Sequence, residues 1–154
     1  MKKSLIALAA LATVATAAQA QSSVTIYGVM DAALVNVTGA SASGKVQGMG
    51  NGGLSTPRLG FRGTEDLGGG LKANFNLEAE LLVDTGSQTS TPEALFARRS
   101  TVGLEGNFGR VDLGRMDTLS YSQVAGFDGM GGNNIGGLVA TGSHGQTRVE
   151  NAVT

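Results

Sequence analysis

Hydrophobic and polar residues alternate along much of this 154-residue chain. The clearest run covers residues 71–80, where apolar residues at odd positions alternate with lysine, asparagine or glutamate at even positions. Alternation with a period of two predicts a β-strand with one apolar and one polar face. Ten residues also match the roughly 9–11 that a tilted strand needs to cross a bilayer.

Shorter stretches repeat this pattern and predict further strands, over residues 24–35, 58–64, 101–105 and 110–114, with a sixth strand starting at 148 and still running at 154. The connections between them alternate in length. Long ones cover residues 39–56, 82–93 and 116–147, and short ones cover 65–70 and 106–109. Short turns at one end and longer loops at the other are typical of outer-membrane barrels. We expect no helix after residue 20, because the region 125–137 is too rich in glycine.

The first 20 residues have the order of a secretory signal peptide. Lys2 and Lys3 form a basic start, an apolar run follows over residues 5–18, and residues 18–20 (Ala-Gln-Ala) form a small-x-small cleavage site. The apolar run is shorter than the about 20 residues of a membrane-spanning helix. We therefore expect cleavage after Ala20 and a mature chain over residues 21–154.

Composition narrows the possible functions. Glycine accounts for 25 of 154 residues, well above the usual share of about 7%, which favours turns and strands over helices. Without Lys2 and Lys3, nine basic residues stand against twelve acidic ones, so there is no basic footprint for nucleic acid. Cysteine is absent and His144 is the only histidine. We expect no metal site, no cofactor and no enzymatic activity, since no catalytic constellation is present.

Several blocks of the sequence resemble Gram-negative porins of the beta-proteobacterial type. They are residues 24–31 (VTIYGVMD), 59–73 (LGFRGTEDLGGGLKA), 96–104 (FARRSTVGL), 108–115 (FGRVDLGR) and 148–154 (RVENAVT). The resemblance implies an all-β fold, a transmembrane antiparallel β-barrel with 16 strands in the family. Residues 21–154 would supply about the first five to six. It also implies a homotrimer in the outer membrane that lets small hydrophilic solutes and ions diffuse passively.

The resemblance also implies where the channel narrows. In this family the loop between strands five and six folds into the barrel, so we expect residues 116–147 to form a constriction loop. Its carboxylates, Asp117 and Asp128, would then face a ladder of arginines on the opposite wall. Separate acidic and basic groups across a narrow zone discriminate ions by charge. The candidate arginines are Arg58, Arg62, Arg98 and Arg99.

Alternation assigns the remaining orientations. Arg99 falls on the polar side of its strand but Arg98 on the lipid side, where mid-membrane arginine costs about 2–4 kcal/mol. Arg98 therefore either lies near the rim or is turned inward by a bulge. Tyr27 and Phe108 are expected near the periplasmic rim, as girdle aromatics. Other residues expected to face the lumen have mixed charges that leave the ion preference open: Asp31, Lys72, Glu78 and Asp112.

Two alternatives stay open at this stage. A secreted all-β surface or adhesion module would also explain export, glycine and alternation, but it would close its own core in water. A porin-like chain would need detergent. Because an open sheet edge cannot sit in lipid, five to six strands are not expected to form a pore alone. The chain would then be a fragment of a longer sequence or a non-functional remnant of an interrupted gene.

Overall fold

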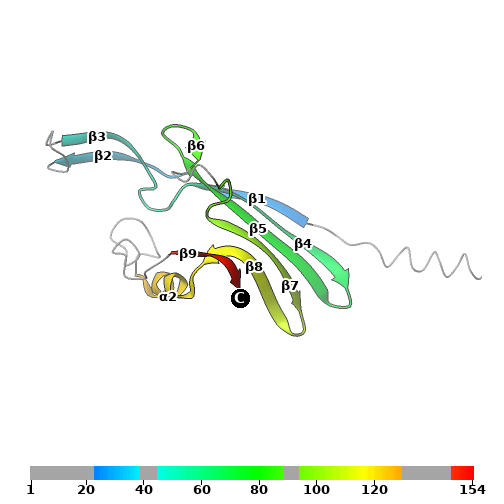
Figure 1. Ribbon diagram of the computed structural model, residues 1–154. Helices are drawn as coiled ribbons and strands as arrows, with labels where there is room; N and C mark the ends of the chain where they lie inside the picture. The colour runs from blue at the N-terminus through cyan, green and yellow to red at the C-terminus, as the bar shows by residue number, and fades with distance from the viewer. Residues whose placement is uncertain (1–22, 39–44, 89–93, 130–146) are drawn as a thin grey trace, which may run out of the picture.

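The computed structural model describes residues 23–38, 45–88, 94–129 and 147–154. The predicted signal peptide and most of the predicted constriction loop lie outside these residues. The main element is an antiparallel sheet with the strand order β1-β4-β5-β7-β8-β9, and the short β6 pairs with the end of β5. Its strands are β1 (Ser23–Val29), β4 (Arg58–Gly68), β5 (Leu71–Leu82), β6 (Ser87–Gln88), β7 (Arg99–Gly106), β8 (Gly109–Asp117) and β9 (Arg148–Val153). The predicted antiparallel strands are thus confirmed (Figure 1).

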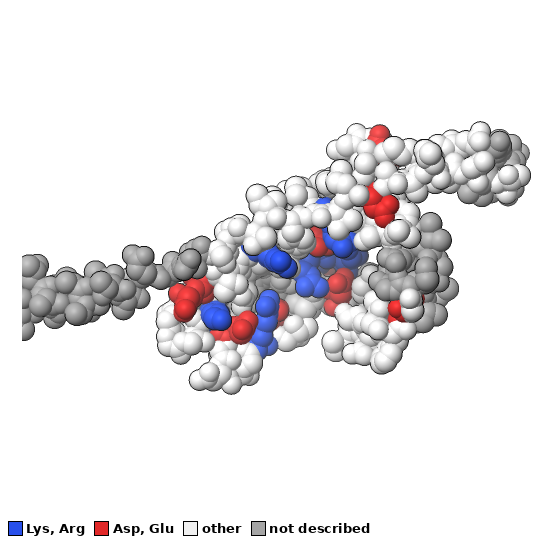
Figure 2. Space-filling view, turned by 180° about the vertical axis from the view of Figure 1, so that it is seen from behind, with Lys and Arg blue, Asp and Glu red and all other residues white. Residues whose placement is uncertain are grey.

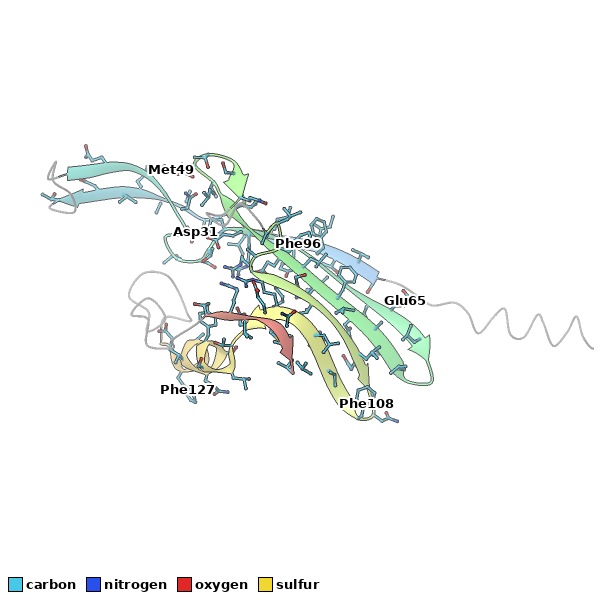
Figure 3. The ribbon with its side chains drawn as sticks, viewed as in Figure 1. Asp31, Met49, Glu65, Phe96, Phe108 and Phe127 are labelled. Atoms are coloured by element: carbon cyan, nitrogen blue, oxygen red, sulfur yellow. The ribbon has the colours of Figure 1, made fainter. Side chains whose placement is uncertain are left out.

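Burial in this sheet is the reverse of that in a water-soluble protein. Asn74 and Thr101 are each only 7% exposed, whereas Ile26 is 67% and Val102 59% exposed. Residues in register on neighbouring strands point to the same face. The polar side chains of several strands therefore cover one another on one face, and the apolar side chains are exposed on the other. An extended apolar face of this kind indicates contact with a membrane or another protein. Side chains drawn along the strands show the two faces (Figure 3).

Short turns lie at one end of the long strands and longer connections at the other (Figure 1). Gly68, Gly69 and Gly70 have φ angles of +84°, +63° and +82° between β4 and β5. Gly109, with φ +98°, follows the turn between β7 and β8. Glycine adopts positive φ without the steric penalty that other residues meet. The glycines therefore allow the tight turns that place successive polar rows side by side.

The first predicted strand is wrong in its length. It stops at Val29, and a separate hairpin follows, formed by β2 (Ala32–Thr38) and β3 (Lys45–Asn51). The cause is Asp31, whose carboxylate accepts hydrogen bonds from the amides of Gly53, Leu54 and Ser55 at 3.2, 2.8 and 2.6 Å. These bonds fix the chain where it leaves the sheet. The predicted loop 39–56 therefore contains a strand.

The absence of a helix after residue 20 is also a wrong prediction. Helix α2 (Leu119–Phe127) follows β8 directly. Thr118 caps it, since its Oγ1 accepts a hydrogen bond from the Tyr121 amide at 3.2 Å, and such caps satisfy the unpaired amides of a first turn. In the part of the chain that the structure describes, no helix has both the length and the apolar character needed to cross a membrane.

Candidate functional site

Charged side chains gather on the polar face of the curved sheet (Figure 2). Their positions follow from register. Tyr27 on β1 lies opposite Gly60 on β4, Gly60 opposite Glu78 on β5, and Glu78 opposite Arg99 on β7. One row of residues thus crosses four strands. The charged cluster forms around this row, near the end of the sheet that holds the longer connections.

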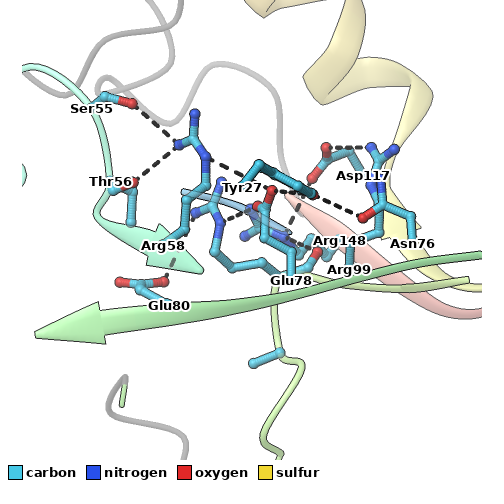
Figure 4. Close-up of polar contacts among 12 residues, drawn as sticks. Tyr27, Ser55, Thr56, Arg58, Asn76, Glu78, Glu80, Arg99, Asp117 and Arg148 are labelled. Carbon is cyan, nitrogen blue, oxygen red and sulfur yellow. Dashed lines mark hydrogen bonds and ion pairs between the residues drawn. The ribbon is translucent and has the colours of Figure 1, made fainter. Parts of the chain in front are cut away.

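Glu78 is the centre of the cluster (Figure 4). Its Oε1 lies 2.5 Å from Arg98 Nε, and its Oε2 accepts a hydrogen bond from the Tyr27 hydroxyl at 3.0 Å. Arg58 Nε is 3.8 Å from the same Oε2. Glu80 lies on the same face of β5, with Oε2 4.0 Å from Arg98 Nη1. Each oxygen of the Glu78 carboxylate therefore has its own donor.

Arg98 lies directly before β7, and its side chain turns toward the polar face. The Arg98 amide donates to the Glu78 carbonyl oxygen at 3.1 Å, although Arg99 is the register partner of Glu78. The regular pairing of β5 with β7 therefore ends at Arg99, and Arg98 is not bound by the alternation of the strand. Both guanidinium groups consequently reach acidic partners on the polar face, and the Arg98 side chain is only 14% exposed. Arg98 was expected either near the rim or turned inward, and in the structure its side chain points inward, to the polar face.

Asp117 lies at the end of β8, beside the arginines and on the same wall. Its Oδ2 accepts a hydrogen bond from Arg99 Nη2 at 3.1 Å, and its Oδ1 is 3.3 Å from Arg148 Nε. Arg148 Nε also donates to the Arg98 carbonyl oxygen at 2.8 Å. This differs from the expectation that Asp117 faces the arginines from across the bore. The reason is that β8 extends to Asp117 before the chain leaves the sheet.

The other predicted residues are more dispersed. Asp31 binds backbone amides where the chain leaves β1, including that of Ser55, whose Oγ accepts a hydrogen bond from Arg58. Lys72 lies toward the turn, in register with Asp66 and Glu105. Asp112 pairs with Arg110 at 2.7 Å. Asp128 lies at the C-terminal end of α2 and is 8% exposed.

Sequence reasoning missed two members of the cluster, Tyr27 and Arg148, whereas Glu80 lies on the polar side of β5, as alternation predicts. Tyr27 was expected in an aromatic girdle, yet its hydroxyl lies among the charges of the polar face. Its alternation with Ile26 would have placed it there. The orientation of Arg148 could not be predicted, because the β8–β9 pairing has an irregularity between Gly114 and Met116 that interrupts the alternation.

The cluster borders a concavity on the polar face of the sheet. A concavity of about 460 Å³ opens on the polar face below the cluster, with Arg62, Arg99 and Arg110 among its lining residues. Among the described residues, no group of three or more acidic, histidine or cysteine side chains is placed to hold a metal ion. Fixed charges beside a passage act on permeating ions at close range.

Comparisons with known proteins identify relatives of this chain. The family model described as Gram-negative porin matches residues 7–154. The chain is 49% identical over 136 residues to outer membrane porin protein 32 of Delftia acidovorans, covering 88% of this chain and 38% of that protein. It is 38% identical over 159 residues to an outer membrane porin protein of Bordetella pertussis, covering 88% of this chain and 40% of that protein.

A solved structure is similar as well. It is an anion-selective porin from Comamonas acidovorans, with a TM-score of 0.71 and 39% identity. The match covers 86% of this chain and 42% of that one. The chain thus spans about two fifths of the length of the relatives it matches.

Proposed function

Because the chain belongs to the Gram-negative porin family, we propose that it forms part of the wall of an outer-membrane channel for passive diffusion of small hydrophilic solutes and ions. Its polar face would line the aqueous bore and its apolar face would meet lipid or neighbouring subunits. Transport of this kind runs down a gradient and requires neither a cofactor nor catalysis. The observation that supports it best is the reversed burial, with polar side chains inside and apolar ones outside.

We propose further that the channel prefers anions. Among the described residues, the cluster has four arginines, which outnumber its three carboxylates: Arg58, Arg98, Arg99 and Arg148 against Glu78, Glu80 and Asp117. A fifth arginine, Arg62, lies beside the cluster against the Tyr27 ring. An excess of fixed positive charge raises the local concentration of anions. The similar porin from Comamonas acidovorans is described as anion-selective, which supports the same sign here.

The test requires a closed barrel. Residues 21–154 are joined to the part of the Delftia acidovorans porin beyond its matched region, and this chimeric channel is inserted into planar bilayers. Replacing both Arg58→Ala and Arg62→Ala removes two positive charges from β4, so the reversal potential in a salt gradient should shift toward cations. The permeability ratio of chloride to potassium should fall by roughly threefold to tenfold, as for two partly solvated charges.

A substitution of opposite sign controls for nonspecific damage. Glu80→Gln removes a negative charge from β5, and its carboxylate is only 4.0 Å from Arg98 Nη1. This variant should shift the reversal potential toward anions. If both changes move the reversal potential in the same direction, or neither moves it, the cluster does not set the ion preference. If the unmodified chimera does not conduct, the channel proposal itself is wrong.

Export and assembly complete the proposal. Residues 1–20 would direct the chain across the inner membrane and be removed, so the exported protein should begin at Gln21, as mass spectrometry can determine. The full channel would be a homotrimer, which native mass spectrometry in detergent would reveal. Residues 118–147, which follow β8, would form the constriction loop. A mature protein that retains Met1, or a monomeric channel, would contradict these assignments.

A further inference from the structure

Tyr27 reaches across a neighbouring strand. Its register partner on β4 is Gly60, and a Cβ atom at Gly60 would overlap the Tyr27 ring atoms Cζ, Cε1 and Cε2. The ring therefore lies directly over the glycine backbone. Because nothing larger than hydrogen stands in its way, the hydroxyl extends beyond β4 to Asn76 and Glu78 on β5. An aromatic ring over a glycine is a recognised way to fix strand pairing.

The Tyr27 hydroxyl occupies one oxygen of the central carboxylate. It lies 3.0 Å from Glu78 Oε2 and 2.9 Å from Asn76 Oδ1 (Figure 4). Arg58 Nε stays 3.8 Å from the same Oε2, outside hydrogen-bond distance. Its Nη1 donates instead to Ser55 Oγ and the Thr56 carbonyl oxygen, at 3.2 and 3.0 Å. Arg58 is thus only loosely neutralised by Glu78.

The Tyr27 ring also holds a second arginine. The Arg62 Cζ lies 5.2 Å from the ring centroid, within the range of a cation–π interaction. Among the described residues, no carboxylate lies within ion-pair distance of Arg62. A ring, unlike a carboxylate, orients a guanidinium without cancelling its charge. Arg62 therefore keeps its full positive charge at a defined place on the polar face.

We infer that Tyr27 is a positioning residue that sets the charge preference of the channel. Its hydroxyl keeps Glu78 paired with Arg98 and keeps Arg58 at a distance, while its ring holds Arg62 without an acidic partner. Both effects preserve positive charge at the cluster. This inference rests on the proposed anion channel, and it assigns the preference to an uncharged side chain as well as to the arginines themselves.

The test is Tyr27→Phe in the chimeric channel. The substitution keeps the ring over Gly60 and removes only the hydroxyl, so Arg58 should move onto Glu78 Oε2 and be neutralised more fully. The permeability ratio of chloride to potassium should fall by roughly twofold to fourfold, the size expected for one partly solvated ion pair. Ser23→Ala is the matched control, since it removes a hydroxyl from the same strand and should leave the reversal potential unchanged.

A double-mutant cycle separates positioning from a general structural role. In a Glu78→Gln background there is no carboxylate for Arg58 to approach, so Tyr27→Phe should then produce no measurable shift. A second variant, Gly60→Ala, displaces the ring while keeping the hydroxyl, and it should reproduce the loss of anion preference even if Tyr27→Phe fails to assemble.

Two results would overturn the inference. One is an unchanged reversal potential in both Tyr27→Phe and Gly60→Ala channels. The other is a Tyr27→Phe shift of equal size with and without the Glu78 carboxylate. Either result leaves the channel proposal standing, because the unmodified chimera still conducts and still prefers anions. An unmodified chimera that prefers cations would instead contradict the proposed function.

Discussion

At the scale of single residues, Asp31 shows how one side chain can end a strand. Its carboxylate binds three consecutive amides, at Gly53, Leu54 and Ser55. Hydrogen bonds from backbone amides favour the charged form of a carboxylate. The amides of Ser55 and Leu54 accordingly hold the pKa of Asp31 below its usual value. The group lies outside the strands, between β1 and the projecting hairpin.

The sign of the resulting pH dependence follows from linkage. Because the pKa of Asp31 is lower in the folded chain, the interaction is fully present above the unfolded pKa and is lost as pH falls through the folded pKa. The protection factors of the amides at residues 53–55, which correct the exchange rates for the intrinsic effect of pH, should therefore fall on acidification below about pH 4. Asp31→Asn should show fast exchange at neutral pH as well. Slow exchange in the variant would mean that the carboxylate does not hold this segment.

Side-chain orientation was predictable only where alternation is unbroken. Arg58 and Glu78 lie in regular stretches of β4 and β5, and counting residues placed both on the polar face. Arg98 lies just before β7, where alternation no longer applies, and Arg148 lies near the irregular β8–β9 pairing, where an extra residue reverses the count. Sequence alone left Arg98 with two positions and did not bring Arg148 to Asp117. Tyr27 was misplaced because its type suggested a girdle, although its place in the alternation was polar.

At the scale of elements, the pairing of β7 with β8 depends on Gly114. Its φ is +128°, and a Cβ at this position would overlap the Ser100 carbonyl oxygen. Gly114→Ala should therefore lower the free energy of unfolding by about 1–3 kcal/mol, the usual cost of such a backbone conformation in a residue with a side chain. Urea unfolding of the chimeric channel in detergent measures this change.

A glycine in a different setting serves as the control. Gly126 in α2 has no positive φ, and a Cβ there would meet no atom within 4 Å. Gly126→Ala should be neutral or stabilising by up to about 1 kcal/mol, because alanine favours helices. If the two substitutions have the same effect on unfolding, the conformation of Gly114 is not what secures the strand pair.

The elements themselves were predictable in proportion to their length and regularity. Strand β5 alternates over residues 71–80 and was predicted with nearly its observed bounds, Leu71–Leu82. Helix α2 was missed because its sequence has no amphipathic pattern, in keeping with a helix that has no buried residue. The N-cap residue Thr118 is the one local signal for a helix start. The hairpin of β2 and β3 was missed for another reason. Its second strand contains Gly48 and Gly50, which sequence reasoning assigns to a loop.

At the scale of the whole molecule, the sheet is open. Among the described residues, β1 and β9 each pair on one side only. Unpaired backbone groups at a lipid-facing edge cost several kcal/mol each. The 154-residue chain added to planar bilayers should therefore give no conductance steps, whereas the chimeric channel should. Steps of uniform size from the chain alone would show that copies of it close a barrel together.

The Tyr27 ring occupies the space that a side chain at position 60 would need. A bulkier residue at position 60 would be tolerated only together with a smaller one at position 27. The two sites should therefore be inherited as a unit, and homologues that have lost the glycine should have lost the tyrosine too. In the proposed channel, a substitution at Gly60 would therefore alter the ion preference through the tyrosine that it displaces.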